Sequence, residues 1–274
     1  MLDKVNDILA YDFVRNALLA GSIAAILGAV VGYFVIIRNV GFAAHALAHI
    51  GFTGATGAAL LGLSSLQGML VISCVAGTMM GISGNKLHRS ELAIGMVLSF
   101  ALGIGTLFLA LYKGFVGQAS SILFGNIFGV SQSQIVATMV LAILSLAALA
   151  IFSRRLLFAS LQPDLAESRG ISLTALSTAF MVILAIAVTL ASQVVGILLV
   201  FTLVIGPAGI AARFCRGFWG SIFFSILIGL GSVWVGILLA CVSNWPPSFW
   251  ITAMIFVLYL FGETLSRYVL RLER

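Results

Sequence analysis

The chain has 274 residues, of which 62% are hydrophobic and 8% charged, and its mean hydropathy is +1.21. A soluble domain carries about 25% charged residues, so this composition excludes a soluble globular protein and predicts a lipid environment for most of the chain. The net charge of +6 comes from basic residues between or after apolar runs, a pattern typical of membrane proteins that argues against nucleic-acid binding.

The N-terminal segment, residues 1–15, mixes acidic and basic side chains with apolar ones at helical spacing. A cleavable signal peptide would begin with basic residues and lack the acidic ones. We therefore expect an amphipathic helix at the membrane interface.

The rest of the chain consists of long apolar stretches, and a helix needs about 20 such residues to cross a bilayer. The sequence predicts an all-α integral membrane protein, a polytopic bundle of eight or nine transmembrane helices in one domain, 1–274. The expected spans are 16–37, 40–63, 66–84, 91–112, 132–152, 171–190, 193–213, 218–242 and 247–268. The semi-polar, glycine-rich stretch 113–131 leaves open whether one of the nine is a re-entrant segment.

The basic loops predict the orientation. With 85–90, 153–170, 214–217 and the C-terminus in the cytoplasm, every strongly basic loop is internal. Nine spans then place the N-terminus outside, and Trp245 and Trp250 in the outer headgroup zone.

Small residues recur inside the expected spans. Helix backbones approach closely in lipid where such residues face each other, so we interpret three GxxxG pairs as packing sites. They are Gly28/Gly32, Gly77/Gly81 and Gly125/Gly129. Gly206 and Pro207 interrupt the seventh expected span near its middle, and we expect a kink there, compatible with a gate.

Two histidines lie inside the second expected span, where an ionisable side chain is costly and needs a reason. His45 and His49 are separated by i, i+4, so on a helix both imidazoles point the same way. Such a pair is a common half-site for zinc or another borderline divalent metal. Two neutral histidines hydrogen-bonded to neighbouring helices are the alternative.

The cytoplasmic loop 153–170 ends in a segment with the signals of a short helix. Pro163 and Asp164 would open this helix and Gly170 would end it. A short helix parallel to the membrane is suited to docking a soluble partner; an ordinary connector between two spans is the alternative. The sequence contains no GxxxxGK[ST] motif, so it cannot bind ATP phosphates by that motif, and its expected spans lack Asp and Glu apart from boundary positions. We therefore expect a transport subunit and not an enzyme, with the energy for uphill transport supplied by another subunit.

Four segments in order resemble the ABC-3 family of zinc and manganese permeases, over nearly the whole chain. They are Ala44-His45-Ala46-Leu47-Ala48-His49 with the small residues Gly51 to Gly57, Leu123-Phe124-Gly125, Gln162-Pro163-Asp164-Leu165-Ala166…Gly170, and Val195-Gly196-Ile197-Leu198-Leu199-Val200…Pro207-Ala208.

The resemblance implies the permease subunit of an ATP-binding-cassette importer, with a fold like that of type II importers. Its implied partners are a second copy of the chain, a pair of ATPase subunits, and a periplasmic or surface metal-binding protein. His45 and His49 would contact the transported ion, which moves by alternating access in the inner (plasma) membrane. No permanently bound cofactor is implied. The coupling helix would comprise Gln162, Pro163, Asp164, Leu165, Ala166, Glu167 and Gly170.

The chain departs from the family pattern at two positions: His45 replaces an aspartate and Thr53 replaces a proline. Because imidazole suits zinc and carboxylate suits harder ions such as manganese, we hypothesise zinc as the cargo ahead of manganese or iron. The substitution also leaves open that the site has moved. The alternative functions are uptake of cobalamin or an iron chelate, an ion-coupled secondary carrier, and a structural membrane protein.

Overall fold

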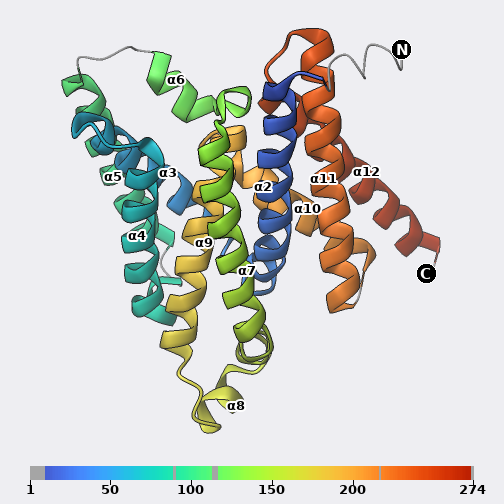
Figure 1. The fold of residues 1–274 in the computed structure, drawn as a ribbon. Coiled ribbons are helices and arrows are strands. Elements are labelled where there is room, and N and C mark those ends of the chain that lie inside the picture. Colours follow the sequence, from blue (N-terminus) through green and yellow to red (C-terminus); the bar gives the residue numbers. More distant parts are fainter. Residues whose placement is uncertain (1–9, 89–90, 113–116, 216, 273–274) are drawn as a thin grey trace.

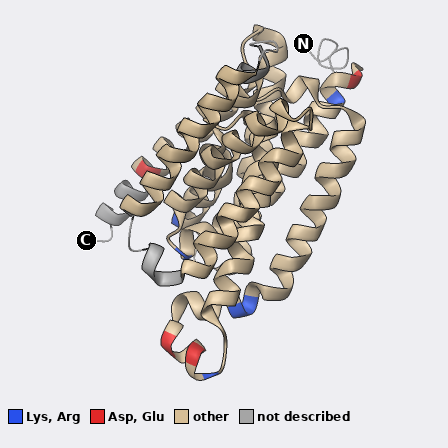
Figure 2. Cartoon of the chain, turned by 90° about the vertical axis from the view of Figure 1, so that its left-hand side faces the viewer, with Lys and Arg blue, Asp and Glu red and all other residues tan. Residues whose placement is uncertain are grey.

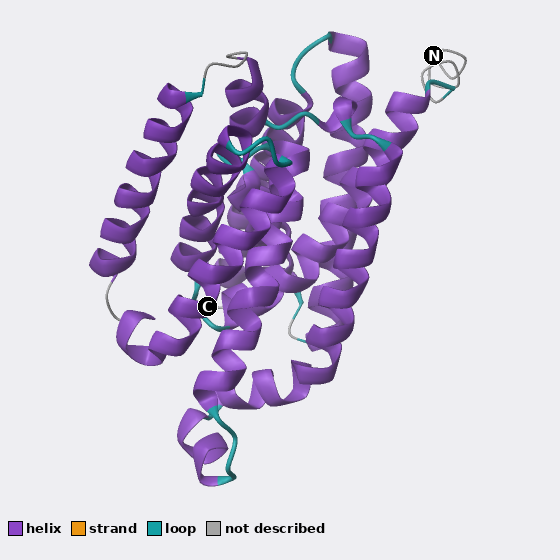
Figure 3. Ribbon diagram, turned by 60° about the vertical axis from the view of Figure 1, so that its left-hand side comes forward, coloured by secondary structure: helices purple, strands orange, loops and turns teal. Residues whose placement is uncertain are grey.

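The computed structural model describes residues 10–88, 91–112, 117–215 and 217–272, and this part of the chain consists of helices and loops (Figures 1 and 3). Nine of its helices have 15 or more residues, in agreement with the nine expected spans. They are α2 (Asp12–Ile37), α3 (Gly41–Leu60), α4 (Ser65–His88), α5 (Glu91–Leu111), α7 (Gln132–Leu161), α9 (Leu173–Val195), α10 (Val200–Phe214), α11 (Phe218–Ser243) and α12 (Pro247–Leu272). Three short helices complete it: α6 (Gly117–Phe124), the 3₁₀ turn η1 (Ile127–Gly129) and α8 (Pro163–Ser168).

Seven of the nine long helices in the described ranges are both long and apolar enough to cross a membrane; α3 and α10 are not among them. The 20 residues of α3 include two histidines and two threonines, which lower its hydropathy. The 15 residues of α10 extend about 22 Å, less than the roughly 30 Å of a hydrocarbon core. Both helices contain many buried residues, so neither depends on lipid contact.

Three expected boundaries were wrong. α2 begins at Asp12, so residues 12–15 belong to the first span and not to a separate interfacial helix; residues 1–9 lie outside the described part. α7 continues to Leu161, which shortens the expected 153–170 loop, because a helix can extend beyond the bilayer into water. The seventh span begins at Val200 instead of 193, since α9 continues to Val195 and Gly196, at φ +84°, ends it.

The centre of the bundle is formed by α2 and α9. α9 packs against α4, α7 and α2, while α2 also packs against α10 and α11. Fully buried side chains on these two helices include Leu27, Phe34, Phe180, Met181 and Leu184. α5 packs mainly on α3 and stands at the edge of the bundle (Figure 1).

The GxxxG pairs have two different structural roles. A Cβ atom added to Gly32 would overlap the carbonyl oxygen of Val204 on α10, and one added to Gly77 would lie 2.8 Å from the carbonyl oxygen of Met181 on α9. Gly28/Gly32 and Gly77/Gly81 therefore lie where two helices pack closely, as predicted. Gly125/Gly129 is not, because Gly125 follows α6 in a loop at φ +80° and packs on the backbone of Gly196.

Charged residues gather at the two ends of the bundle (Figure 2). Five arginines lie at or near helix ends on the α8 side, and Arg15 lies in the first turn of α2 at the opposite end. The five are Arg38, Arg154, Arg155, Arg169 and Arg213. By the positive-inside rule, we expect the α8 end to face the cytoplasm. Trp245 and Trp250 stack with ring centroids 5.7 Å apart at the other end, where the sequence predicts an outer aromatic belt.

Candidate functional site

The two histidines of α3 lie on one face of the helix, in its cytoplasmic half. With a rise of 1.5 Å per residue, His45 and His49 stand about 6 and 12 Å along the helix from Gly41. Their ring centroids are 4.5 Å apart and their planes meet at 69°. Both side chains are half-buried. The i, i+4 spacing therefore places the two imidazoles side by side on one face of α3, as expected; that they contact a metal ion remains a prediction.

The histidine pair lies against α10. The Phe201 ring lies edge-on to His45, with centroids 5.7 Å apart. Phe201 is 41% exposed and Phe42, one turn before His45, is 40% exposed. In the described residues no cluster of three or more His, Cys, Asp or Glu side chains exists. The pair is therefore an open half-site with two nitrogen donors and an apolar wall.

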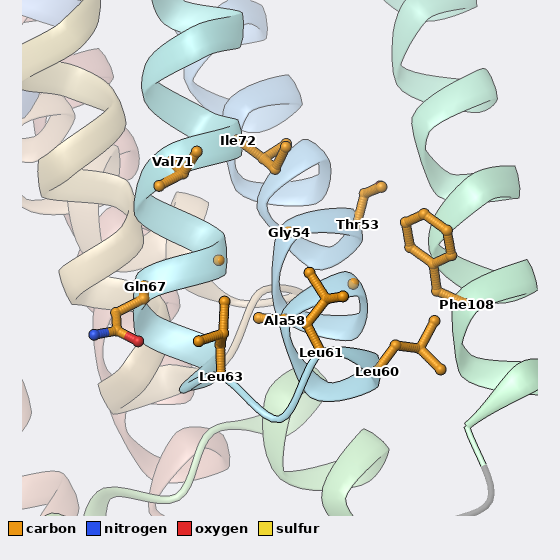
Figure 4. A pocket seen from close by; sticks show the side chains of 12 residues that line it. Thr53, Gly54, Ala58, Leu60, Leu61, Leu63, Gln67, Val71, Ile72 and Phe108 are labelled. Carbon is orange, nitrogen blue, oxygen red and sulfur yellow. The ribbon is translucent and has the colours of Figure 1, made fainter.

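The outer half of α3 borders an apolar cavity of about 400 Å³ between α3, α4 and α5 (Figure 4). Leu60, Leu61, Val71 and Phe108 line it, with Gln67 at one side. The hydroxyl of Thr53 donates a hydrogen bond to the Ala101 carbonyl oxygen and is not free to bind a ligand. This cavity lacks the donors that a metal ion needs, so it does not extend the histidine site.

A half-buried cation beside the start of α3 was missed by the sequence analysis. Arg38 ends α2, donates from Nη2 to the Ser177 hydroxyl on α9 at 3.2 Å, and places its guanidinium 5.3 Å from the centre of the Phe180 ring. The available signal was an arginine directly between two apolar runs. Arg38 fixes the cytoplasmic end of the α2–α3 hairpin against α9.

The Gly206-Pro207 step lies inside α10, and the helix continues through it to Phe214. Pro207 is buried and has no N–H group for the Leu203 carbonyl. A Cβ atom on Gly206 would overlap Ile255 of α12. The step is therefore a close contact of α10 with α12 at a point where the helix lacks one hydrogen bond, and a role in gating remains a prediction.

The expected coupling segment forms a compact hairpin at the cytoplasmic end. Pro163 occupies the first turn of α8, and Gly170, at φ +77°, ends the turn by donating its N–H to the Glu167 carbonyl at 2.9 Å. Ala166 is fully buried, whereas Leu165 is 44% exposed. The hairpin thus presents nearly all of its side chains outward from the bundle.

Comparison with known proteins identifies relatives over almost the full length. The manganese import system permease protein ScaB of Streptococcus gordonii is 27% identical over 95% of each chain. The manganese transport system membrane protein MntC of Listeria innocua is 27% identical over 86% of this chain and 85% of its own.

Two solved structures resemble the fold. The structure of PsaBC from Streptococcus pneumoniae in complex with a Fab superposes with a TM-score of 0.85 at 26% identity, over 96% of this chain and 95% of that one. An inward-facing metal-chelate type ABC transporter gives 0.61 at 17% identity, over 91% and 84%, a likeness of fold alone. The model of the ABC 3 transport family matches residues 10–265. The chain is a multi-pass membrane protein of the ABC 3 transport family.

Proposed function

We propose that this chain is the permease subunit of an ATP-driven importer of divalent metal ions, and that the ions pass beside His45 and His49. The observation that carries the proposal is the neighbouring pair of imidazoles on one face of α3, 4.5 Å apart. Ionisable side chains inside a membrane are rare and lie on substrate paths or in relays. Family membership and relatives named as manganese permeases support a metal ion as cargo.

The open half-site suits transport better than storage. A structural zinc site has four ligands and a closed tetrahedral shell, whereas this pair supplies two. An ion held by two imidazoles, with water completing its shell, can leave when the surrounding helices move. α10 borders the pair through Phe201 and carries Pro207, so movement of α10 would open or close the space beside His45.

Energy and delivery come from partners in this proposal. The sequence lacks the phosphate-binding GxxxxGK[ST] motif, so a separate ATPase subunit would hydrolyse ATP. The hairpin around α8 would dock on it, with Leu165 among the contacting residues. A second copy of the chain and a soluble metal-binding protein would complete the transporter; membership of the ABC 3 transport family supports this assembly.

Zinc is the cargo that the ligands favour. Imidazole suits zinc and other late first-row ions, whereas manganese prefers carboxylate and carbonyl oxygen. Both donors of the pair are imidazoles, and no described carboxylate joins them. Relatives named for manganese make the ion selectivity the part of the proposal in most need of a test.

Uptake of radioactive zinc and of radioactive manganese at equal concentrations tests the selectivity. The chain would be reconstituted in liposomes with its ATPase and binding protein, with ATP supplied to the ATPase side. We expect faster ATP-dependent uptake of zinc. Equal rates for the two ions, or faster manganese uptake, would contradict the zinc assignment and leave the metal importer standing. Uptake of neither ion would contradict the importer itself.

A further inference from the structure

A basic cavity lies between α7 and α9 at the α8 end of the bundle, and no residue of α3 is among those that line it. Its volume is about 490 Å³, and Arg155, Arg169, Ser172 and Phe152 are among the residues that line it. Arg155 comes from the last turns of α7, and Arg169 from the hairpin behind α8. Two guanidinium groups from different elements therefore border one cavity.

Neither arginine is neutralised within the described part of the chain. The ion pair found there joins Arg213 to Glu263, and no carboxylate lies within ion-pair distance of Arg155 or Arg169. The guanidinium of Arg169 stacks 5.3 Å from the centre of the Phe158 ring on α7, which fixes its position beside the cavity. Two positive charges held without a protein counter-ion favour an anionic ligand.

The start of α9 adds to this preference. Ser172 caps the helix by accepting a hydrogen bond from the Ala175 N–H at 3.3 Å. Leu173 and Thr174 are the first two residues of α9. Their backbone N–H groups have no carbonyl partner within the helix, because they lie in its first turn. Because α9 has 23 residues, its N-terminal end carries a positive partial charge that attracts anions. Ser172 and Ala175 of this helix start line the cavity, so the positive end of the helix lies beside the two arginines.

The surface of α7 indicates where the anion comes from. Val140, Leu144 and Ile151 form an exposed apolar stripe along this helix, and the same helical spacing continues from Ile151 to Arg155. A stripe of this kind in a membrane protein faces acyl chains. It leads directly into the basic cavity at the level of the cytoplasmic headgroups, an arrangement suited to a phospholipid but not required by a free phosphate ion.

We propose that this cavity binds the phosphate of an anionic phospholipid of the inner leaflet, with Arg155 and Arg169 on the headgroup and an acyl chain along the α7 stripe. Basic pockets between transmembrane helices on the cytoplasmic side recognise such headgroups. The site is independent of the transported ion. Since Arg169 directly follows α8, a bound lipid would also brace the hairpin proposed to dock on the ATPase.

The test measures phosphatidylglycerol retained by the purified full-length chain after delipidation, by native mass spectrometry, against phosphatidylcholine with the same acyl chains. The variants are Arg155→Gln, Arg169→Gln and the double variant. Arg154→Gln is the matched control, because it removes the same charge from the neighbouring position, which does not line the cavity. Arg155→Lys keeps the charge, and thermal unfolding of each variant checks its folding.

We expect preferential retention of phosphatidylglycerol by the unmodified chain. Each single glutamine variant should lower its affinity about fivefold and the double variant about 25-fold, from the roughly 1 kcal/mol that one basic residue contributes near an anionic surface. Arg154→Gln and Arg155→Lys should retain most of the lipid. An equal loss in Arg154→Gln, or no loss in the double variant, would overturn the proposal.

Two further measurements distinguish a phospholipid from other anionic ligands of the cavity. Inorganic phosphate at millimolar concentration should not displace phosphatidylglycerol; displacement would assign the cavity to a soluble phosphate. Copurification of the ATPase should persist in the double variant. Loss of the ATPase with unchanged lipid retention would mean that the arginines bind an acidic surface of that subunit, and would overturn the lipid site.

Discussion

The imidazole rings of His45 and His49 stand edge to face with their centroids 4.5 Å apart. One turn of α3 separates the two residues, and the Phe201 ring of α10 meets His45 from the other side. Two nitrogen ligands are thus placed next to a helix that contains an internal proline. The two histidines proposed to contact the ion therefore lie next to α10, the helix whose movement would open the ion path.

A carboxylate in place of the first imidazole should change the ion preference. We expect His45→Asp to raise the ratio of manganese to zinc uptake about tenfold, equivalent to about 1.4 kcal/mol, because oxygen ligands suit manganese. Parallel uptake of the two ions in liposomes measures the ratio. His45→Ala is the control and should lower uptake of both. An unchanged ratio in His45→Asp would place the selective ligands elsewhere.

The crossing of α2 and α10 should not tolerate a side chain at Gly32. In Gly32→Ala the new Cβ atom would overlap the backbone oxygen of Val204, which cannot rotate away. We expect a loss of about 1–3 kcal/mol in stability, seen as a lower temperature of thermal unfolding in detergent. Gly95→Ala is the matched control, since a Cβ atom there meets nothing within 4 Å. Equal unfolding temperatures for the two variants would refute the close crossing.

The hairpin around α8 should be needed for ATPase binding and not for folding. Leu165→Ser removes an exposed apolar side chain, so we expect a change in stability within about 0.5 kcal/mol and a clear loss of copurifying ATPase. Leu198→Ser provides the comparison, because Leu198 has the same 44% exposure as Leu165 and lies in the turn between α9 and α10, at the opposite end of α9 from α8. If both variants retain the ATPase equally, Leu165 is not a docking residue.

Arg213 should hold the cytoplasmic end of α10 against α12. It pairs with Glu263 and donates from Nη2 to the Tyr259 hydroxyl at 2.9 Å. The paired side chains are 27% and 29% exposed, so water screens the pair and Glu263→Gln should cost only about 0.2–1 kcal/mol. Arg213→Met should cost more, because it also removes the contact with Tyr259. Thermal unfolding of the two variants distinguishes these losses; a smaller loss for Arg213→Met would contradict the arrangement.

The helical bundle was largely predictable because hydropathy and helix length are local properties of the sequence. All nine expected spans correspond to helices. The ends were harder to predict: Gly196 takes a positive φ and ends α9, while the apolar sequence gives no sign of a break there. Gly125/Gly129 has the same spacing as a helix-packing pair, but spacing alone does not establish that the segment is helical.

Only the part of the candidate site that lies within one helix was predictable from the sequence. The i, i+4 spacing of His45 and His49 fixes their shared face on any helix. The neighbours Phe201 and Ser177 are far away in sequence, and they reach His45 and Arg38 through the packing of α10 and α9. Such contacts depend on how helices cross, which hydrophobic periodicity does not determine. The basic cavity of Arg155 and Arg169 was missed for the same reason.

The most direct test is ATP-dependent uptake of radioactive zinc by liposomes that contain the chain, its ATPase and its binding protein, in the unmodified form and with both His45→Ala and His49→Ala. The account predicts loss of uptake in the double variant, with assembly of the transporter and basal ATP hydrolysis retained. Zinc uptake at the unmodified rate in the double variant would contradict an ion path beside this pair.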